Sequence, residues 1–197
     1  MNRSEIAPGI MSYKNVINHA TALNLQLESA METAGISWGQ AYIKSNNQSV
    51  IDTNYRDTGT IQVNHYGHKI EDYSTPQNSL FSSLSNLFLE KFNPIQEDYK
   101  NYYRTSSSSH EDYAILKYGA GQKFVDHIDT YDNNRNISMV YYMNDDYEGG
   151  EIVFPRFDIK HKPEKDEMIL FPSIYVYNHE VLPVVSGVRY AVASWLK

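Results

Sequence analysis

The sequence predicts a mainly β fold with flanking helices, whose core is a double-stranded β-helix, or jelly roll. Two amphipathic helical patterns lie in the first half of the chain, and short segments rich in Tyr, Val, Ile and Phe fill the second half. Gly, Asn, Asp and Pro separate these segments, as turns separate the strands of all-β domains. With 197 residues and 41% apolar composition, the chain is expected to form one domain, residues 1–197, with a substantial core.

The first helix is predicted over residues 12–34, because apolar residues recur there every three or four positions. They are Val16, Ala20, Leu23, Leu27, Met31 and Ala34. Gly35 follows them and supplies a stop signal. A hairpin or loop over residues 43–70 is expected to lead from this helix to the second one.

The second helix is predicted through a similar apolar stripe. Its members are Leu80, Leu84, Leu87, Phe88 and Phe92. Asn78 and Ser79 are expected to open this helix, and Asn93 and Pro94 to close it, because proline lacks the amide hydrogen that helix continuation needs. Both helices are expected to support the fold from residues 1–110, with the jelly-roll core in residues 111–197.

Strands are predicted after the polar turn at residues 105–109, where β-branched and aromatic residues become dense. The expected strands cover residues 113–118, 123–129, 137–143, 151–154, 168–171, 175–179 and 188–196. Polar turns at residues 144–146 and 148–150 separate some of them. Strands of this number and spacing indicate a double-sheet jelly roll or a barrel.

Composition excludes several classes of function. The chain carries 24 acidic and 17 basic residues, a net charge of −7, and no basic run that would bind nucleic acid phosphates. It has no cysteine, so any metal must be held by nitrogen and oxygen ligands. No segment approaches the roughly 20 apolar residues of a membrane span, and no signal peptide pattern is found. We therefore expect a cytoplasmic protein that binds neither membrane nor nucleic acid.

Candidate metal ligands lie in the β-rich half. His127 and Asp129 are two residues apart in a predicted strand, so both side chains project from one face. His179, from another predicted strand, would complete a set of two imidazoles and one carboxylate, which leaves adjacent positions open on iron(II). His65 and His68 form a second pair in a loop, but no third ligand lies near them in the sequence.

Four separated motifs carry a family resemblance. They are Lys-Tyr-Gly-Ala-Gly-Gln at residues 117–122, His-Ile-Asp at 127–129, Asn-His-Glu-Val at 178–181 and Gly-Val-Arg-Tyr at 187–190. In identity, order and distance they resemble the prolyl 4-hydroxylase branch of the Fe(II)/2-oxoglutarate-dependent dioxygenases, of microbial or viral type. The resemblance implies that His127, Asp129 and His179 are iron ligands, and that Arg189 binds the distal carboxylate of 2-oxoglutarate. A planar guanidinium suits that task because it can form two parallel hydrogen bonds with a carboxylate.

The same resemblance implies roles for weaker candidates. Tyr118 and Tyr142 match tyrosines of the co-substrate pocket, and Trp195 matches a tryptophan near the floor of the active site. Each could instead be a packing residue, since the chain has 17 tyrosines and aromatic side chains commonly fill cores. Tyr141 projects to the face opposite Tyr142 and is expected to be structural. Arg56 sits where the family has a substrate-covering loop, and could contact a peptide or be an ordinary loop charge.

The implied reaction is hydroxylation of prolyl residues in a peptide or protein. It would consume 2-oxoglutarate and O2, release succinate and CO2, and use ascorbate as the reductant. The sequence around Arg56 matches the loop of collagen-type enzymes only in part, which speaks against a collagen-like repeat as the substrate. Two alternatives remain open at this point: oxidation of a free amino acid or of another side chain, and a non-catalytic jelly-roll module that has kept a metal pocket. A nucleic acid demethylase fits the acidic charge poorly.

Overall fold

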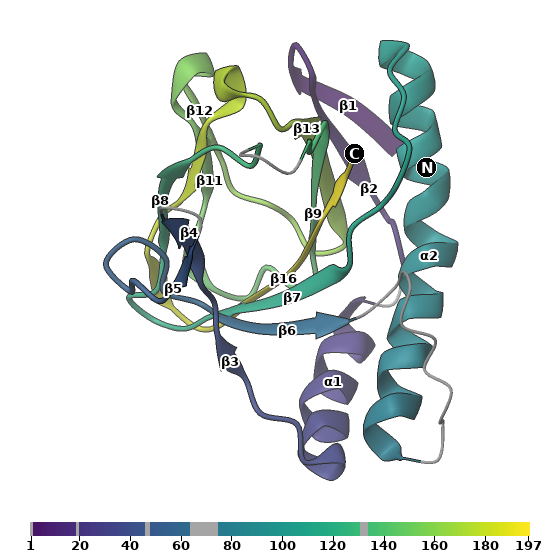
Figure 1. Ribbon diagram of the computed structural model, residues 1–197, viewed down its shortest axis with the longest axis vertical. Helices are drawn as coiled ribbons and strands as arrows, with labels where there is room; N and C mark the ends of the chain where they lie inside the picture. Colours follow the sequence, from purple (N-terminus) through teal and green to yellow (C-terminus); the bar gives the residue numbers. More distant parts are fainter. Residues whose placement is uncertain (1, 19, 46–47, 64–74, 131–133) are drawn as a thin grey trace.

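The computed structural model describes residues 2–18, 20–45, 48–63, 75–130 and 134–197. In these ranges two antiparallel sheets face each other, and two helices cover the outer face of the larger sheet (Figure 1). The larger sheet has eight strands, in the order β1 (Asn2–Ala7), β2 (Ile10–Lys14), β13 (Glu167–Pro172), β9 (Ile137–Tyr142), β16 (Arg189–Leu196), β7 (Tyr113–Tyr118), β6 (Gly59–Val63) and β3 (Gly39–Gln40). The smaller sheet has the order β12 (Ile159–His161), β11 (Ile152–Phe154), β14 (His179–Val181) and β8 (Phe124–His127). This arrangement confirms the predicted mainly β jelly roll with flanking helices.

Two short ribbons complete the strands of the described ranges. β10 (Glu148–Gly149) pairs with β15 (Val184–Ser186), and β4 (Ile43–Ser45) pairs with β5 (Gln48–Val50). Part of the hairpin or loop predicted over residues 43–70 is therefore the β4–β5 hairpin followed by β6. Its last residues, with the pair His65 and His68, lie outside the described residues.

Alternation along the central strands builds one core on each face of the larger sheet. In β9, Met139 and Tyr141 pack under the helices, whereas Tyr142 faces the smaller sheet. In β16, Val192 faces the helices and Ala191 faces inward. Because side chains alternate along a strand, the same strands anchor the helices and wall the space between the sheets.

The first helix, α1 (Ala20–Ala34), begins later than predicted. Residues 12–14, expected to be helical, belong to β2, which pairs with both β1 and β13. Met11 and Tyr13 alternate in that strand and are buried, and Asn15 adopts a positive φ of 59° just after it. Pairing with distant strands therefore outweighs the local helical spacing.

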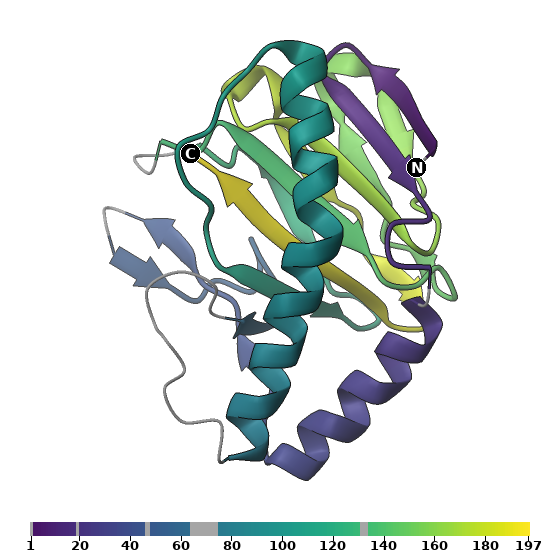
Figure 2. The same ribbon diagram turned by 90° about the vertical axis from the view of Figure 1, so that its right-hand side faces the viewer.

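The second helix, α2 (Pro76–Tyr103), is longer at both ends than predicted and lies across the larger sheet (Figure 2). It begins after Thr75, whose hydroxyl accepts a hydrogen bond from the Asn78 amide at 3.2 Å. Pro94 does not end it. Proline inside a helix costs about 3 kcal/mol, but the buried side chains of Phe92, Ile95 and Tyr99 on the sheet offset this cost.

Six of the seven predicted strands are confirmed, whereas the strand predicted over residues 175–179 is wrong except for its last residue. β8 ends at His127, so Asp129 lies beyond the strand. Residues 175–177 form a short 3-10 helix, and β14 starts only at His179, because the chain turns there before it pairs with β8. β1, β3, β12 and β15 are not predicted. The polar turn predicted at residues 148–150 is wrong in part, because Glu148 and Gly149 form β10 by pairing with β15. None of the helices in the described ranges combines the length and apolar character needed to cross a membrane.

A buried carboxylate ties β13 to its neighbours. Glu167 is fully buried and accepts hydrogen bonds from the Ser12 hydroxyl, the Glu164 amide at 2.8 Å and His161 Nε2 at 3.0 Å. Burial alone would raise the pKa of Glu167, but these hydrogen bonds together outweigh it and lower the pKa. A lowered pKa in the folded state stabilises the fold above the unfolded pKa, and this stabilisation is lost as pH falls through the folded pKa.

Replacing Glu167 with Gln is expected to reduce the free energy of unfolding by about 1–3 kcal/mol near pH 7, because charge-assisted hydrogen bonds are lost. The difference from the unchanged protein should shrink as the pH falls below about 4, where the glutamate itself becomes protonated. Urea unfolding near pH 7 and below about pH 4 measures this difference in stability. Glu164→Gln, at a side chain 62% exposed, is the matched control and should change stability little. An equal loss at both pH values would contradict an ionised Glu167.

Candidate metal centre

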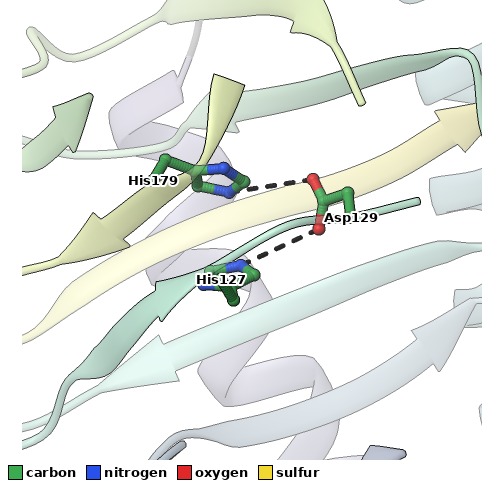
Figure 3. Close-up of side chains that lie close together, drawn as sticks. All are labelled: His127, Asp129 and His179. Carbon is green, nitrogen blue, oxygen red and sulfur yellow. Dashed lines mark ion pairs between the residues drawn. The ribbon is translucent and has the colours of Figure 1, made fainter. Parts of the chain in front are cut away.

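Three side chains converge between the sheets, as Figure 3 shows: His127, Asp129 and His179. One ligand atom from each lies within 4.8 Å of the others. His127 Nε2 is 3.8 Å from Asp129 Oδ1, and His179 Nε2 is 3.7 Å from Asp129 Oδ2. In the part of the chain that the structure describes, no other group of His, Asp and Glu has this geometry. The predicted candidate ligands are therefore brought together.

The two histidines come from paired strands. His127 is the last residue of β8, His179 is the first of β14, and the two are direct cross-strand partners. Asp129 reaches them from beyond the end of β8 rather than from a shared strand face, which corrects the expected geometry. The Ser138 hydroxyl of β9 donates to Asp129 Oδ2 at 2.6 Å, so the larger sheet holds the carboxylate where β8 no longer does.

Backbone carbonyls orient both imidazoles. His127 Nδ1 lies 2.8 Å from the Val125 carbonyl oxygen, and His179 Nδ1 lies 3.1 Å from that of Tyr177. Since a carbonyl oxygen can only accept, Nδ1 carries the proton in each ring and Nε2 presents its lone pair to the centre. Phe124 stacks on His127 with ring centroids 3.5 Å apart and fixes that ring further.

The charge states of two of these groups suit a metal cation. Burial, reinforced by the nearby His179, lowers the pKa of His127, which keeps its imidazole neutral. Burial alone would raise the pKa of Asp129, but the neighbouring histidines and hydrogen bonds from Ser138 and Trp195 outweigh it and lower the pKa. A neutral imidazole and an ionised carboxylate are the forms that bind metals.

A cavity of about 770 Å³ opens onto this centre. Its walls include the three converging residues and the other predicted site residues Arg56, Tyr118, Tyr142, Arg189 and Trp195. The structure thus places all of them in one cavity. Tyr141 lies on the opposite face, where its hydroxyl donates to Asp166 Oδ1 at 2.8 Å, as expected for a structural residue.

Arg189 is a buried cation that has no acidic partner among the described residues. It is 1% exposed, and its guanidinium carbon lies 4.8 Å from the Tyr118 ring centroid and 5.1 Å from that of Tyr142. Its Nε and Nη1 and the Tyr142 hydroxyl make no well-formed hydrogen bond with the described residues, and no carboxylate among these pairs with Arg189. Because a buried unpaired charge is costly, an anion bound beside Arg189 would offset this cost.

Tyr147 was not predicted as part of the site. Its buried hydroxyl lies near the Arg189 guanidinium and also lacks a well-formed hydrogen bond in the described ranges. The Lys162 ammonium sits 3.4 Å from the centroid of its ring. Tyr147 lies between the polar turns predicted at residues 144–146 and 148–150, so only its aromatic character could have marked it.

Arg56 reaches the cavity because its segment lines the free edge of β8. The Val125 amide donates to the Tyr55 carbonyl at 3.0 Å, and the Asp57 amide donates to the Lys123 carbonyl at 2.9 Å. This pairing sets the Arg56 guanidinium carbon 4.7 Å from the Phe124 ring centroid. Arg56, the residue of the predicted substrate loop, therefore contacts the ring that stacks on His127.

A polar clamp joins the two histidine strands on their outer face. Asn178 Nδ2 donates to both carboxylate oxygens of Asp126, at 2.7 and 2.9 Å. These residues immediately precede His179 and His127. Arg156 Nε donates to Asn178 Oδ1 at 3.0 Å and orients the amide. The clamp fixes the spacing of the strands at the metal centre.

Asn178→Ala is expected to weaken binding of Co²⁺, used as a spectroscopic probe, about tenfold, because groups that orient metal ligands contribute this much to affinity. The double variant Asp126→Asn with Asn178→Asp should restore most of the affinity, since it again sets a donor against an acceptor. Titration of the cobalt absorption bands measures both. If the melting temperature fell but the affinity stayed unchanged, the clamp would be purely structural.

Comparisons with known proteins support a family. Residues 113–197 match the 2OG-Fe(II) oxygenase superfamily, and this segment contains all three converging residues and Arg189. Prolyl 3-hydroxylase 2 of Homo sapiens is 44% identical over 66 residues, which cover 31% of this chain but only 9% of the human protein. The chain thus spans a small part of that relative's length.

Solved structures of prolyl hydroxylases share the fold. One, from Trichoplax adhaerens in complex with a hypoxia inducible factor peptide fragment, has a TM-score of 0.65 at 20% identity and covers 95% of this chain and 83% of its own. A Pseudomonas putida prolyl-4-hydroxylase has a TM-score of 0.63 at 16% identity, over 96% of this chain and 92% of its own. These neighbours show a shared fold, and the superfamily match covers the β-rich part of the chain that carries the candidate metal ligands and Arg189.

Proposed function

We propose that this chain is an Fe(II)- and 2-oxoglutarate-dependent dioxygenase that hydroxylates prolyl residues in a peptide or protein and releases succinate and CO2. One observation carries the proposal: a cluster of two histidines and one aspartate shares a cavity with a buried arginine that has no acidic partner in the described ranges. The two histidines and the aspartate suit a divalent metal, and the arginine suits the distal carboxylate of a dicarboxylate.

Iron(II) would be held by His127, Asp129 and His179. The donor set supports this choice, because two imidazoles and one carboxylate on one side of the metal are the ligand set of non-haem iron(II) oxygenases. The chain's own groups prepare the ligands: carbonyls hold Nδ1 protonated on both histidines, and Ser138 holds the carboxylate. The site therefore needs little rearrangement to bind the metal.

2-Oxoglutarate would be oriented by Arg189 at its distal carboxylate, with Tyr142 as a second donor. The unpaired buried Nε and Nη1 of Arg189 and the Tyr142 hydroxyl support this assignment, since an anion would satisfy them. Tyr118 and Trp195 would form the walls that exclude water. With iron and 2-oxoglutarate bound, the centre would supply the chemistry that inserts one oxygen atom of O2 into a C–H bond, while the other oxygen atom enters succinate as CO2 is released, and ascorbate would keep the iron in its Fe(II) state.

The substrate would enter from the side of the cavity that carries Arg56. The names of the relatives, prolyl hydroxylases, support a prolyl-containing peptide or protein. We further propose that residues 1–110 provide helical support and a substrate loop, that residues 111–197 are the catalytic core, and that the two act as one domain. Two helices packed on the outer face of the larger sheet support this division.

Succinate formation from 2-oxoglutarate, with iron(II) and ascorbate, tests the proposal. Proline-containing peptides should stimulate turnover, and His127→Ala should reduce it to background because a metal ligand is lost. Arg189→Lys should raise the KM for 2-oxoglutarate, since lysine keeps the charge but cannot form two parallel hydrogen bonds. Lack of turnover despite proven binding of iron and 2-oxoglutarate would instead indicate a binding module or a different substrate.

The neighbouring tyrosines Tyr142 and Tyr141 provide a matched pair of variants. Tyr142→Phe is expected to raise the KM for 2-oxoglutarate about tenfold, the loss of roughly one charge-assisted hydrogen bond, with a smaller effect on kcat. Tyr141→Phe should leave that KM unchanged and lower the melting temperature, because its hydroxyl bonds to Asp166 under the helices. Steady-state kinetics and thermal unfolding measure both. A larger effect of Tyr141→Phe on KM would contradict the assignment of the two faces.

A further inference from the structure

Arg56 is a cation of the cavity wall that has no acidic partner among the described residues. Its Nη1 donates to the Tyr42 carbonyl oxygen at 3.3 Å, whereas its Nε is buried and makes no hydrogen bond within the described ranges. The adjacent carboxylate of Asp57 is used elsewhere: its Oδ1 accepts from Gln122 at 2.9 Å and from Gln40 at 3.3 Å. No carboxylate among the described residues therefore compensates the charge of this guanidinium, which lines the cavity.

The other cations of this wall are neutralised within the protein. Arg135 donates to Glu111, with Nη2 and Oε2 2.6 Å apart, and Lys197 Nζ lies 3.1 Å from the same carboxylate. Arg189 faces the far end of the cavity and serves the co-substrate in the proposed function. Arg56 therefore stands apart as a cation on the substrate side without a counter-charge from the described residues.

Arg56 also lies close to the candidate metal centre. Its guanidinium carbon is 4.7 Å from the Phe124 ring centroid, and the Phe124 and His127 ring centroids are 3.5 Å apart. Arg56 and the candidate metal ligand His127 therefore both contact the Phe124 ring. A group bound to Arg56 would thus belong to the residue that reacts or to a residue near it in the substrate.

We propose that the substrate of this site carries a carboxylate near the C–H bond that reacts, and that the Arg56 guanidinium binds it. This inference rests on the oxygenase chemistry of the proposed function and not on a peptide as the substrate. A neutral peptide carbonyl could accept a hydrogen bond from Arg56, but it would leave a partly desolvated charge uncompensated. A carboxylate accepts a charge-assisted hydrogen bond and supplies the missing negative charge. The carboxylate could come from an acidic residue next to the target proline or from the α-carboxylate of proline itself.

Two matched substrate pairs test the inference by succinate release and by mass spectrometry of the product. L-Proline is compared with L-prolinamide, and a peptide with Asp beside proline is compared with the same peptide carrying Asn. In at least one pair, the charged member should have a kcat/KM about tenfold higher, the contribution of one charge-assisted hydrogen bond. The pair that shows the preference identifies the source of the carboxylate.

Variants separate a role in binding from a general effect of charge. Arg56→Gln should lower kcat/KM of the charged substrate to that of its amide, without changing the KM for 2-oxoglutarate. Arg56→Lys should keep part of the preference. Lys160→Gln removes the same charge from a side chain 60% exposed on β12 and should leave the preference intact.

The outcomes distinguish this inference from the proposed function. Equal turnover of charged and amide substrates, or an equal loss of both in Arg56→Gln, would overturn the carboxylate role while leaving the oxygenase intact. If no substrate released succinate although iron and 2-oxoglutarate bind, the proposed function itself would fail, and the carboxylate role with it.

Discussion

The pairing of β8 with β14 sets the distance between His127 and His179, and the geometry of the candidate site depends on it. β8 is short and lies at the edge of the smaller sheet, so β14 is its partner within that sheet. Two further contacts hold it: the segment of Tyr55 and Asp57 along its free edge, and the clamp of Asp126 with Asn178 on its outer face. With these three contacts, β8 can position the His127 side chain as precisely as a strand in the centre of a sheet could. Asp129 then needs only an anchor on the larger sheet, which Ser138 supplies.

Strand alternation lets the larger sheet serve two purposes. Tyr141 and Val192 pack under α1 and α2, while Tyr142, Arg189 and Ala193 face the cavity. The helices therefore stabilise the same strands that carry the pocket, without entering it. A long helix such as α2 spans several strands and resists their sliding past one another, which keeps the register that the pocket requires.

Arginine side chains line the cavity, although the chain as a whole carries a net negative charge. The chain has a net charge of −7, yet the cavity contains Arg189 and Arg56 without acidic partners in the described ranges. Leaving a cation partly desolvated and unpaired costs stability, so such residues indicate a ligand that offsets the cost when it binds. Arg189 and Arg56 both line the cavity that contains the candidate metal centre, which suits anionic ligands. Arg135 lines the same cavity, but its charge is neutralised by Glu111.

The sequence by itself determined the fold class, the presence of two helices and the residues that converge in the cavity. His127, His179 and Arg189 could be recognised because their motifs are local, and Tyr141 and Tyr142 could be assigned to opposite faces because strand alternation has a period of two. Only the tertiary structure decided that residues 12–14 form a strand, that Pro94 lies inside a helix, that Asp129 acts from beyond β8, and that Tyr147 lies beside Arg189. The reason is physical: local periodicity reports how a segment could bury its apolar residues, whereas the final choice depends on hydrogen bonds and contacts with segments far away in the chain.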